Sequence, residues 1–446
     1  MKAGCCKIDI TPQTGTPIGG NIRQDNRSKG VHDPLYANFL YLNDGRHALL
    51  FIGLDLIGIF ASFGRLIKEG IRERTGILPE SIILFATHTH SGPDVMEAFK
   101  DEYDPLVISY IEELTRKVIE GAVLCTDNVW EAAVGIGKGY EDALSFNRRI
   151  MMQDGTLRMN WEGLDPSQVK SAAGPIDPDV FVISVADERR AIRSILVHFT
   201  LHTAVLVGKD GLISRDYVHS LTERLEHRFG RDTVVLFANG AEGDINHIDI
   251  SNPGQARDFG EAERIGSRLA GRVLDVLPTL KYSAALRLKS VSKPVLFPRR
   301  RITEEQVRHA LQLLENAGWS IPSLLDGVPD EAYAKEILIL SQHKAEFLQT
   351  ELQAVQIGDH ALLSLPCELF AELGLAIKER SPYLHTLIVG MANDYIGYVP
   401  TERAFEEGGY EIKTARTSQL TPQAGELIVR ESIGLLNGLK GGESIP

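Results

Sequence analysis

Two histidines two positions apart, His88 and His90, stand just after the apolar run Ile82 to Ala86 and just before the pair Gly92-Pro93. Such a run, stopped by Gly-Pro, predicts a buried strand that ends in a loop. Residues two apart on a strand share a face, so we expect both imidazoles to lean into one cavity. Imidazole is the commonest neutral metal ligand and the commonest general acid or base. The pair therefore indicates a metal or catalytic site, provided that other ligands reach it.

Three further apolar runs also end in side chains that can bind a metal. They are followed by His202, by Glu368, and by Tyr395 or Tyr398. A catalytic zinc takes three or four nitrogen and oxygen ligands and keeps a position open for water. Taken singly, each residue has a structural explanation, as a core histidine, a carboxylate at a helix start or a packing tyrosine. The same pattern at four strand ends indicates one shared metal site.

The composition excludes several classes of protein. The 446 residues are 43% hydrophobic and 24% charged, with a net charge of −13, which argues against nucleic acids and anionic membrane surfaces as partners. No apolar run approaches the roughly 20 residues of a membrane-spanning helix, and the start of the chain lacks an apolar signal core. Four scattered cysteines are too few for a disulfide framework. We therefore expect a cytoplasmic protein that acts on a small molecule without membrane insertion.

The order of the predicted elements indicates an α/β fold. Strand, helix and strand patterns alternate along the first 90 residues, and Asn43-Asp-Gly45 predicts a hairpin turn. Asp55, at a predicted strand end, is expected near the sheet edge where open α/β sheets bind ligands. We find no repeat or linker, so mixed sheets flanked by helices should form a single domain over residues 1–446. Two amphipathic helical patterns, Glu304 to Ala317 and Glu331 to Leu348, predict a helical arm at about 303–350, used for packing or for a homo-oligomer surface.

At this point the chain resembles a known family, the neutral/alkaline non-lysosomal ceramidases, in their catalytic N-terminal domain. The motifs that carry the resemblance are Asp9-Ile-Thr-Pro12 with Pro17-Ile-Gly-Gly20, Val31-His-Asp-Pro-Leu-Tyr36, Ala86-Thr-His-Thr-His-Ser-Gly-Pro93, Asn147-Arg148, His202, Gly243-Asp-Ile245, Pro366-Cys-Glu368, and Tyr398-Val-Pro-Thr-Glu402 with Tyr410. They span nearly the whole chain in the family's order, and the block around His88 is the most specific of them.

The resemblance implies a fold and a set of site residues. It implies a neutral-ceramidase-like catalytic domain with one Zn²⁺. The metal ligands that it implies are His88, His202, Glu368 and Tyr398. The contacts to the substrate amide that it implies are His90, Arg148 and Tyr410.

Two departures from the family pattern change the expected substrate. The family reads Gly-Asp-Val-Ser where this chain has Asn246 in the place of the serine; Asn246 cannot be a nucleophile but can donate a hydrogen bond. The chain also ends without the family's C-terminal immunoglobulin-like domain and has no secretion signal. We therefore expect a bacterial-type cytoplasmic relative that keeps the zinc and uses ceramide poorly.

The expected reaction is zinc-dependent hydrolysis, in which metal-bound water attacks an amide-like C–N bond of a small soluble substrate. His90 would move a proton or hold the oxyanion, and Arg148 and Tyr410 would donate hydrogen bonds to it. Asp216 and Asp244 are candidates for orienting the imidazoles.

Other functions remain open at this stage. The same zinc site would suit a lactonase or esterase, a glycoside-type hydrolase or a true ceramidase. An amidohydrolase on a (β/α)8 barrel carries its His-x-His pair near the chain start, whereas roughly 85 residues precede it here. A zinc- or carbohydrate-binding protein without catalysis would not need the full set of predicted residues.

Overall fold

One central sheet of eight strands organises the fold, seen in a computed structural model that describes residues 1–22, 25–96, 99–100, 102–324 and 326–441. The strand order is β14-β12-β11-β6-β1-β3-β4-β5. In chain order these strands are β1 (Lys2–Asp9), β3 (Tyr36–Asn43), β4 (Ala48–Leu54), β5 (Ile82–Ala86), β6 (Trp130–Tyr140), β11 (Asp179–Asp187), β12 (Ile192–Phe199) and β14 (Val234–Asn239). The pairs β4–β5 and β12–β14 are parallel and the others antiparallel, so the sheet is mixed.

A second sheet packs on one face of the central sheet. It has the order β16-β17-β18-β20 and consists of β16 (Leu288–Pro298), β17 (Phe347–Ile357), β18 (His360–Ser364) and β20 (His385–Val389). Buried residues of both sheets form one apolar cluster, with Leu40 and Phe51 from the central sheet and Leu362 and Val389 from the second. The two sheets therefore share one core.

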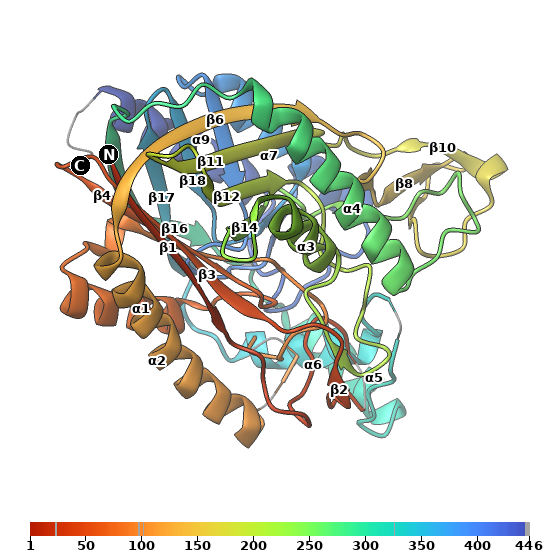
Figure 1. The fold of residues 1–446 in the computed structure, drawn as a ribbon. Helices are drawn as coiled ribbons and strands as arrows, with labels where there is room; N and C mark the ends of the chain where they lie inside the picture. Colours follow the sequence, from red (N-terminus) through yellow and green to blue (C-terminus); the bar gives the residue numbers. More distant parts are fainter. Residues whose placement is uncertain (23–24, 97–98, 101, 325, 442–446) are drawn as a thin grey trace.

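Helices cover the two outer faces, which gives four layers (Figure 1). On the central sheet, α1 (Ala61–Thr75) and α2 (Pro105–Asp127) pack over β3 to β5, while α3 (Tyr217–Phe229) and α4 (Phe259–Val276) pack over β11, β12 and β14. On the second sheet, the cover is α7 (Ala371–Arg380) and α9 (Ala424–Gly441). The prediction of an α/β fold with mixed sheets and flanking helices is confirmed.

The predicted hairpin between β3 and β4 is also confirmed. Gly45 has a φ of 88°, which L side chains rarely adopt, and its N–H donates to the Asn43 side chain at 2.7 Å. This turn fixes the register that leads β4 to its end at Leu54, beside the end of β5.

The two sheets converge where their parallel strands end. The backbone N–H of Ala86, at the end of β5, donates to Met391 at 3.1 Å, and that of Gly390 donates to Asn239, at the end of β14, at 3.1 Å. The loops that follow β4, β5, β12, β14, β18 and β20 therefore leave the sheets at one edge, where α/β folds bind ligands.

Short strand pairs order these loops. The pairs are β13 (Leu212–Ile213) with β2 (Gly30–Val31), β15 (Ile245–Asn246) with β7 (Phe146–Asn147), and β19 (Glu368–Leu369) with β21 (Tyr398–Val399). Residues 149–172, expected as a surface excursion, form a small sheet of β8 (Arg149–Met152), β9 (Leu157–Met159) and β10 (Val169–Ala172). The short helix α8 (Glu402–Glu407) follows β21.

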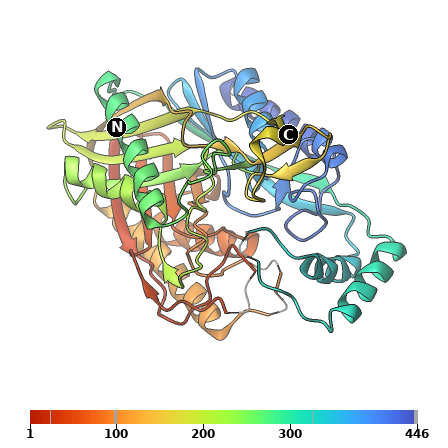
Figure 2. The same ribbon diagram turned by 90° about the vertical axis from the view of Figure 1, so that its right-hand side faces the viewer.

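The helical arm is shorter than predicted. It consists of α5 (Glu304–Asn316) and α6 (Asp330–Ser341), and it projects from the layers at the lower right of Figure 2. The helical pattern expected up to residue 348 was wrong beyond Ser341, because residues from Phe347 onward pair with β16 along the 11 residues of β17. This sheet pairing overrides a local helical period. Among the described residues, we find no helix with the length and apolar character needed to cross a membrane.

Candidate metal centre and active site

The predicted histidines do meet, although not for the reason that strand alternation gives. The strand β5 ends at Ala86, and His88 lies beyond it with a φ of 65°, in the left-handed region that non-glycine residues seldom adopt. The backbone N–H groups of His88 and His90 then bond to Leu56 at 2.9 Å and to Thr203 at 3.1 Å. A bent loop, held by two neighbouring strand ends, therefore aims both rings at one point.

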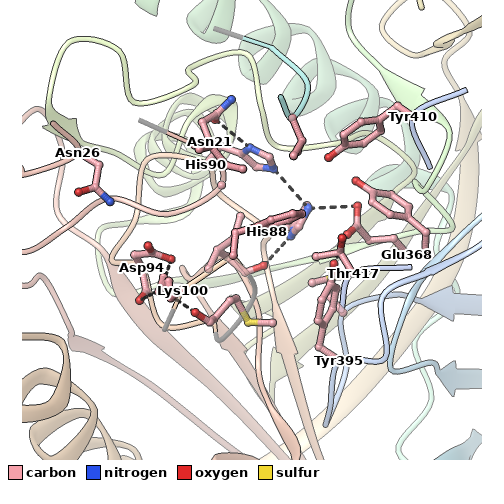
Figure 3. A pocket seen from close by; sticks show the side chains of 18 residues that line it. Asn21, Asn26, His88, His90, Asp94, Lys100, Glu368, Tyr395, Tyr410 and Thr417 are labelled. Atoms are coloured by element: carbon pink, nitrogen blue, oxygen red, sulfur yellow. Dashed lines mark hydrogen bonds and ion pairs between the residues drawn. The ribbon is translucent and has the colours of Figure 1, made fainter. Parts of the chain in front are cut away.

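Three imidazoles, which we call the histidine cluster, converge through their Nε2 atoms. The Nε2 atom of His88 lies 3.0 Å from that of His202, and His90 Nε2 lies 3.2 Å from that of His202. The Nε2 atoms of His88 and His90 are 3.4 Å apart (Figure 3). Ligand nitrogens roughly 2.0–2.1 Å from one tetrahedral zinc would lie roughly 3.3 Å apart. The described residues contain one such group of possible ligands, these three histidines.

The outer nitrogens of the rings fix how each ring is held. His88 Nδ1 contacts the backbone oxygen of Ile57 at 2.5 Å, and His202 Nδ1 contacts that of Glu242 at 3.4 Å. A carbonyl at Nδ1 requires the proton there, so each Nε2 lone pair faces the centre. His90 Nδ1 instead contacts the Asn21 side chain at 3.4 Å, and its ring is half-buried. Backbone groups thus hold His88 and His202, whereas a side chain on a loop holds His90.

Glu368 brings a carboxylate to the same point. Its Oε2 atom lies 3.6 Å from His88 Nε2 and 3.8 Å from His202 Nε2, is buried, and has no hydrogen-bond partner among the described residues. Its Oε1 atom accepts a hydrogen bond from the Tyr395 hydroxyl at 2.7 Å. Burial alone would raise the pKa of Glu368, but the neighbouring His88, with Tyr398 and Tyr395, outweighs it, so the net shift is downward. An ionised oxygen therefore faces the histidine nitrogens.

Tyr398 is the tyrosine that lies opposite Glu368 in the strand register. Parallel pairing of β19 with β21 sets Tyr398 opposite Glu368, and the two side chains interact. The Tyr398 ring lies 5.6 Å from the Tyr410 ring. The Arg148 guanidinium carbon lies 5.4 Å above each of these rings. The structure thus brings together His90, Arg148, Tyr398 and Tyr410.

Arg148 is buried but not left as a bare charge. Its Nε donates to Glu411 at 2.8 Å and its Nη2 to the backbone oxygen of Gly243 at 2.7 Å. Burial raises the pKa of Tyr410 to about 12, although the Arg148 charge opposes the rise, so this phenol keeps its proton at neutral pH. Both side chains are therefore fixed hydrogen-bond donors.

Asn246 makes more contacts within the protein than expected. Its amide pairs reciprocally with that of Asn160, with N–O distances of 2.7 and 2.8 Å, and its Oδ1 also accepts from Ile248 N–H at 3.0 Å. One N–H of the Asn246 amide remains for another acceptor.

The expected orienting carboxylates do not contact the imidazoles. Asp244 accepts from the backbone of Ala371 at 2.8 Å and from Asn147 at 2.6 Å, and Asp216 accepts from Leu206 and Tyr217. The expectation for both aspartates was wrong, because backbone carbonyl groups orient His88 and His202 instead.

Two further features of the site were missed from the sequence. Glu242 is fully buried, neither of its carboxylate oxygens has a partner among the described residues, and burial raises its pKa to about 8. It lies three residues beyond β14, just as His202 lies three beyond the paired strand β12, so the strand-end rule could have found it. The arm was assigned no site residue, yet Gly327 and Val328, in its connecting loop, line the site.

Two cavities meet at the histidine cluster. The first, of about 220 Å³, has the apolar residues Ile57, Met96, Phe99 and Met391 in its wall (Figure 3 shows this cavity). The second, of about 60 Å³, is lined by the polar residues Arg148, Asn246, His247, Arg257 and Asp326, by Trp161, and by the apolar side chains of Ala204, Val207 and Ile248. His90, Tyr398 and Tyr410 line both, together with Gly20 and Asn21.

Comparison with known proteins gives relatives of one kind. The chain is 23% identical to a neutral ceramidase of Pseudomonas aeruginosa over 92% of its length and 68% of the relative's. A crystal structure of neutral ceramidase from the same organism superposes with a TM-score of 0.74 at 19% identity, over 100% of this chain and 75% of the other. A ceramidase structure described as complexed with C2 gives 0.75 at 18% identity, over 100% and 76%.

No family model matches the chain. The structural similarity establishes the fold, and the sequence similarity extends along almost the whole chain. The chain is therefore similar to neutral ceramidases in sequence along almost its whole length, and it shares their fold.

Proposed function

We propose that this protein is a metal-dependent hydrolase that cleaves an amide bond of a small soluble substrate. The observation that carries the proposal is the convergence of three imidazole Nε2 atoms, 3.0 to 3.4 Å apart, on an unpartnered buried oxygen of Glu368. The relatives are named ceramidases, enzymes that hydrolyse the amide bond of ceramide. The named relatives and the converging ligands therefore support the same class of reaction.

The donor set fits zinc. Neutral imidazole nitrogens and one carboxylate oxygen are the ligands of catalytic zinc sites. Burial, with the neighbouring His88 and Arg148, lowers the pKa of His202 well below its usual range, so this ring is neutral and can bind a metal. Glu368 Oε2 has no hydrogen-bond partner within the described part of the chain. Buried polar atoms rarely lack a partner, so this oxygen is suited to bind a ligand. His88, His202, Glu368 and Tyr398 would hold the ion.

The bound metal would polarise a carbonyl oxygen and make water more acidic. The chain's own residues then have separate tasks. Arg148 and Tyr410 are buried donors fixed before the substrate arrives, and they would hydrogen-bond the oxygen on which negative charge develops. The Nε2 atom of His90 faces the same point and would move the proton between the attacking water and the leaving nitrogen.

The cavities favour a small substrate. A volume of about 220 Å³ lies below the roughly 300–1,000 Å³ typical of pockets for drug-sized ligands. Its apolar wall at Met96, Phe99 and Met391 would accept a short alkyl or acyl group. We therefore propose that long-chain ceramide is a poor substrate, as the departure at Asn246 predicts.

Amide cleavage is tested by incubating the purified protein with short-chain N-acyl amines and following amine release. We expect release that stops after chelation and returns with Zn²⁺. Esters, lactones and aryl glycosides with matched groups form the control panel. Hydrolysis of a compound in this control panel without hydrolysis of any amide would contradict the proposed reaction. A rate on short-chain ceramide equal to the rate on the best soluble amide would contradict the proposed substrate class.

A further inference from the structure

A buried histidine in the second cavity has no partner for either ring nitrogen. His247 directly follows Asn246 and has 1% of its surface exposed. Neither Nδ1 nor Nε2 has a hydrogen-bond partner in the part of the chain that the structure describes. By contrast, the buried ring of His198, between the sheets, bonds through Nε2 to the backbone of Ile388 at 2.7 Å. Buried polar groups without partners are rare and costly, so His247 calls for a partner from outside the chain.

The protonation state of His247 defines what that partner is. Burial, with Arg257 nearby, lowers the pKa of His247 to about 3. The ring is therefore neutral at physiological pH, with one nitrogen that donates and one that accepts. A hydroxyl group can accept from the nitrogen that carries the proton or donate to the other one, whereas an alkyl chain satisfies neither nitrogen.

The charges around His247 are already compensated. Arg257 donates through two nitrogens to the carboxylate of Asp326, one of them at 2.8 Å, and Arg148 pairs with Glu411. Each arginine in this wall thus has its own carboxylate, so the compartment does not carry the net positive charge that an anion would need. A neutral polar group fits better than a carboxylate or a phosphate.

We propose that the second cavity is a subsite that binds an uncharged hydroxyl-bearing group of the substrate through His247. The inference rests on the amide hydrolysis proposed above and adds the substrate class. The cavity's volume of about 60 Å³ is several times the roughly 10–15 Å³ that one water needs, so a hydroxylated carbon fits in place of waters. The substrate would place its amide at the boundary residues His90, Tyr398 and Tyr410, its hydroxyl group at His247 and its apolar part in the larger cavity.

Matched amides test this subsite. N-acetylserinol carries hydroxyls on the amine side, N-isopropylglycolamide carries one on the acyl side, N-isopropylacetamide carries none, and N-acetylalanine carries a carboxylate. We expect kcat/KM for one hydroxylated amide to exceed that for N-isopropylacetamide by roughly 10- to 100-fold. His247→Phe should remove most of this preference, because it should lower kcat/KM for the hydroxylated amide more than kcat/KM for N-isopropylacetamide.

Two variants control for structural effects. His360→Phe makes the same change at a histidine on β18 whose Nδ1 also lacks a partner among the described residues, and it should leave the preference intact. His247→Gln keeps a donor and an acceptor and should restore part of the preference. Because His247→Phe removes two unpartnered polar atoms and keeps a planar aromatic ring next to a cavity that can take its extra volume, its Tm should stay equal or rise. A ring needed only for packing would show a lower Tm and no change in preference.

A binding measurement separates this inference from the proposed function. The ring nitrogens of ¹⁵N-histidine-labelled protein are observed by NMR, with the His247 signals assigned as those missing from His247→Phe. Should that variant not fold, the signals are those missing from His247→Gln. They should shift with N-acetylserinol or N-isopropylglycolamide and not with N-isopropylacetamide. A shift without hydrolysis of any amide would contradict the proposed function alone.

Three results would overturn the subsite. The first is equal kcat/KM for the hydroxylated and plain amides. The second is a hydroxyl preference that survives in His247→Phe. The third is a stronger response to N-acetylalanine than to either hydroxylated amide, in rate or in ring shift, which would mean that the cavity binds an anion.

Discussion

The histidine cluster and a second buried group lie on adjoining loops and use their polar atoms differently. The second group, which we call the aspartate cluster, consists of Asp33, Asp55 and Asp216. The loops touch directly, since Ser214 N–H donates to the backbone of Ser91 at 3.0 Å. All three aspartates are at most 2% exposed, as deeply buried as His202. Burial and position at the sheet edge therefore do not distinguish a ligand site from a structural one.

Each carboxylate of the aspartate cluster binds the chain's own backbone, and of the six oxygens only Asp55 Oδ1 lacks a hydrogen-bond partner among the described residues. Asp33 accepts from Arg215 N–H at 2.8 Å, Asp55 from Tyr36 N–H at 2.8 Å, and Asp216 from two backbone N–H groups. In the histidine cluster the inner nitrogens face one another and an unpartnered oxygen. Polar atoms that bind backbone hold loops in place, while polar atoms that face only one another are placed for a ligand.

The largest expected effect is on activity, from the histidine cluster. His88→Ala should lower amide hydrolysis by at least roughly 1,000-fold, because it removes an inner nitrogen of the proposed metal site. The fold should survive, since the lost ring faces a cavity rather than the apolar core. Activity assays with thermal unfolding check this. A variant that keeps more than a tenth of the activity would break the comparison.

The aspartate cluster should give the opposite result. Asp33→Ala removes the carboxylate that accepts hydrogen bonds from the Ser214 hydroxyl and the Arg215 backbone N–H. It also leaves the buried Arg215 guanidinium without the negative charge of Asp33. We expect a loss of about 3–5 kcal/mol in the free energy of unfolding. Activity per folded molecule should fall much less than in His88→Ala. Denaturant unfolding measures the first quantity, and Asp232→Ala, at an exposed position, is the control.

A glycine beside His90 provides a test of intermediate size. Gly20 has a φ of 91°, and a Cβ atom there would lie 2.6 Å from the His90 ring. Gly20→Ala should therefore displace His90 and lower kcat roughly 10- to 100-fold, with metal retained. Gly45→Ala is a matched control, because Gly45 has a φ of 88° and open space around it. Equal activity losses in both variants would mean that backbone strain, not the position of His90, is responsible.

The smallest expected effect concerns a buried charge in the scaffold. Lys68 donates to Gln353 at 3.1 Å, and burial lowers its pKa to about 8. An unfolded lysine titrates near pH 10.4, so the folded protein binds fewer protons between the two values and its stability should rise with pH there, by at most about 1.4 kcal/mol per pH unit. Lys68→Met should flatten this rise, and exposed Lys170→Met should not. Unfolding curves at about pH 7 to 10 check it.

The sequence was sufficient for most elements because local signals coincided with tertiary structure. The predicted strand Ile82 to Ala86 has the same bounds as β5, and the turn residues Asn43 to Gly45 form the predicted hairpin. The prediction of a helix to residue 348 failed because pairing with a distant strand, β16, is invisible in a local pattern.

Site residues were predictable as types, but not in their contacts. Strand ends and family motifs identified His88, His202 and Glu368, which the structure brings together. Sequence could not show the backbone path that brings His90 Nε2 to the same point, because the left-handed conformation of His88 and loop packing decide it. The unpartnered nitrogens of His247 likewise emerge only from the packed structure.

The metal content of the purified protein tests the central claim most directly. Inductively coupled plasma mass spectrometry on the wild type, His88→Ala and Asp33→Ala, each checked for folding, compares the two clusters in one experiment. We predict about one zinc per chain in the wild type and in folded Asp33→Ala, and a large loss in His88→Ala. No stoichiometric metal in the wild type after supplementation with Zn²⁺, or full retention in His88→Ala, would contradict the account.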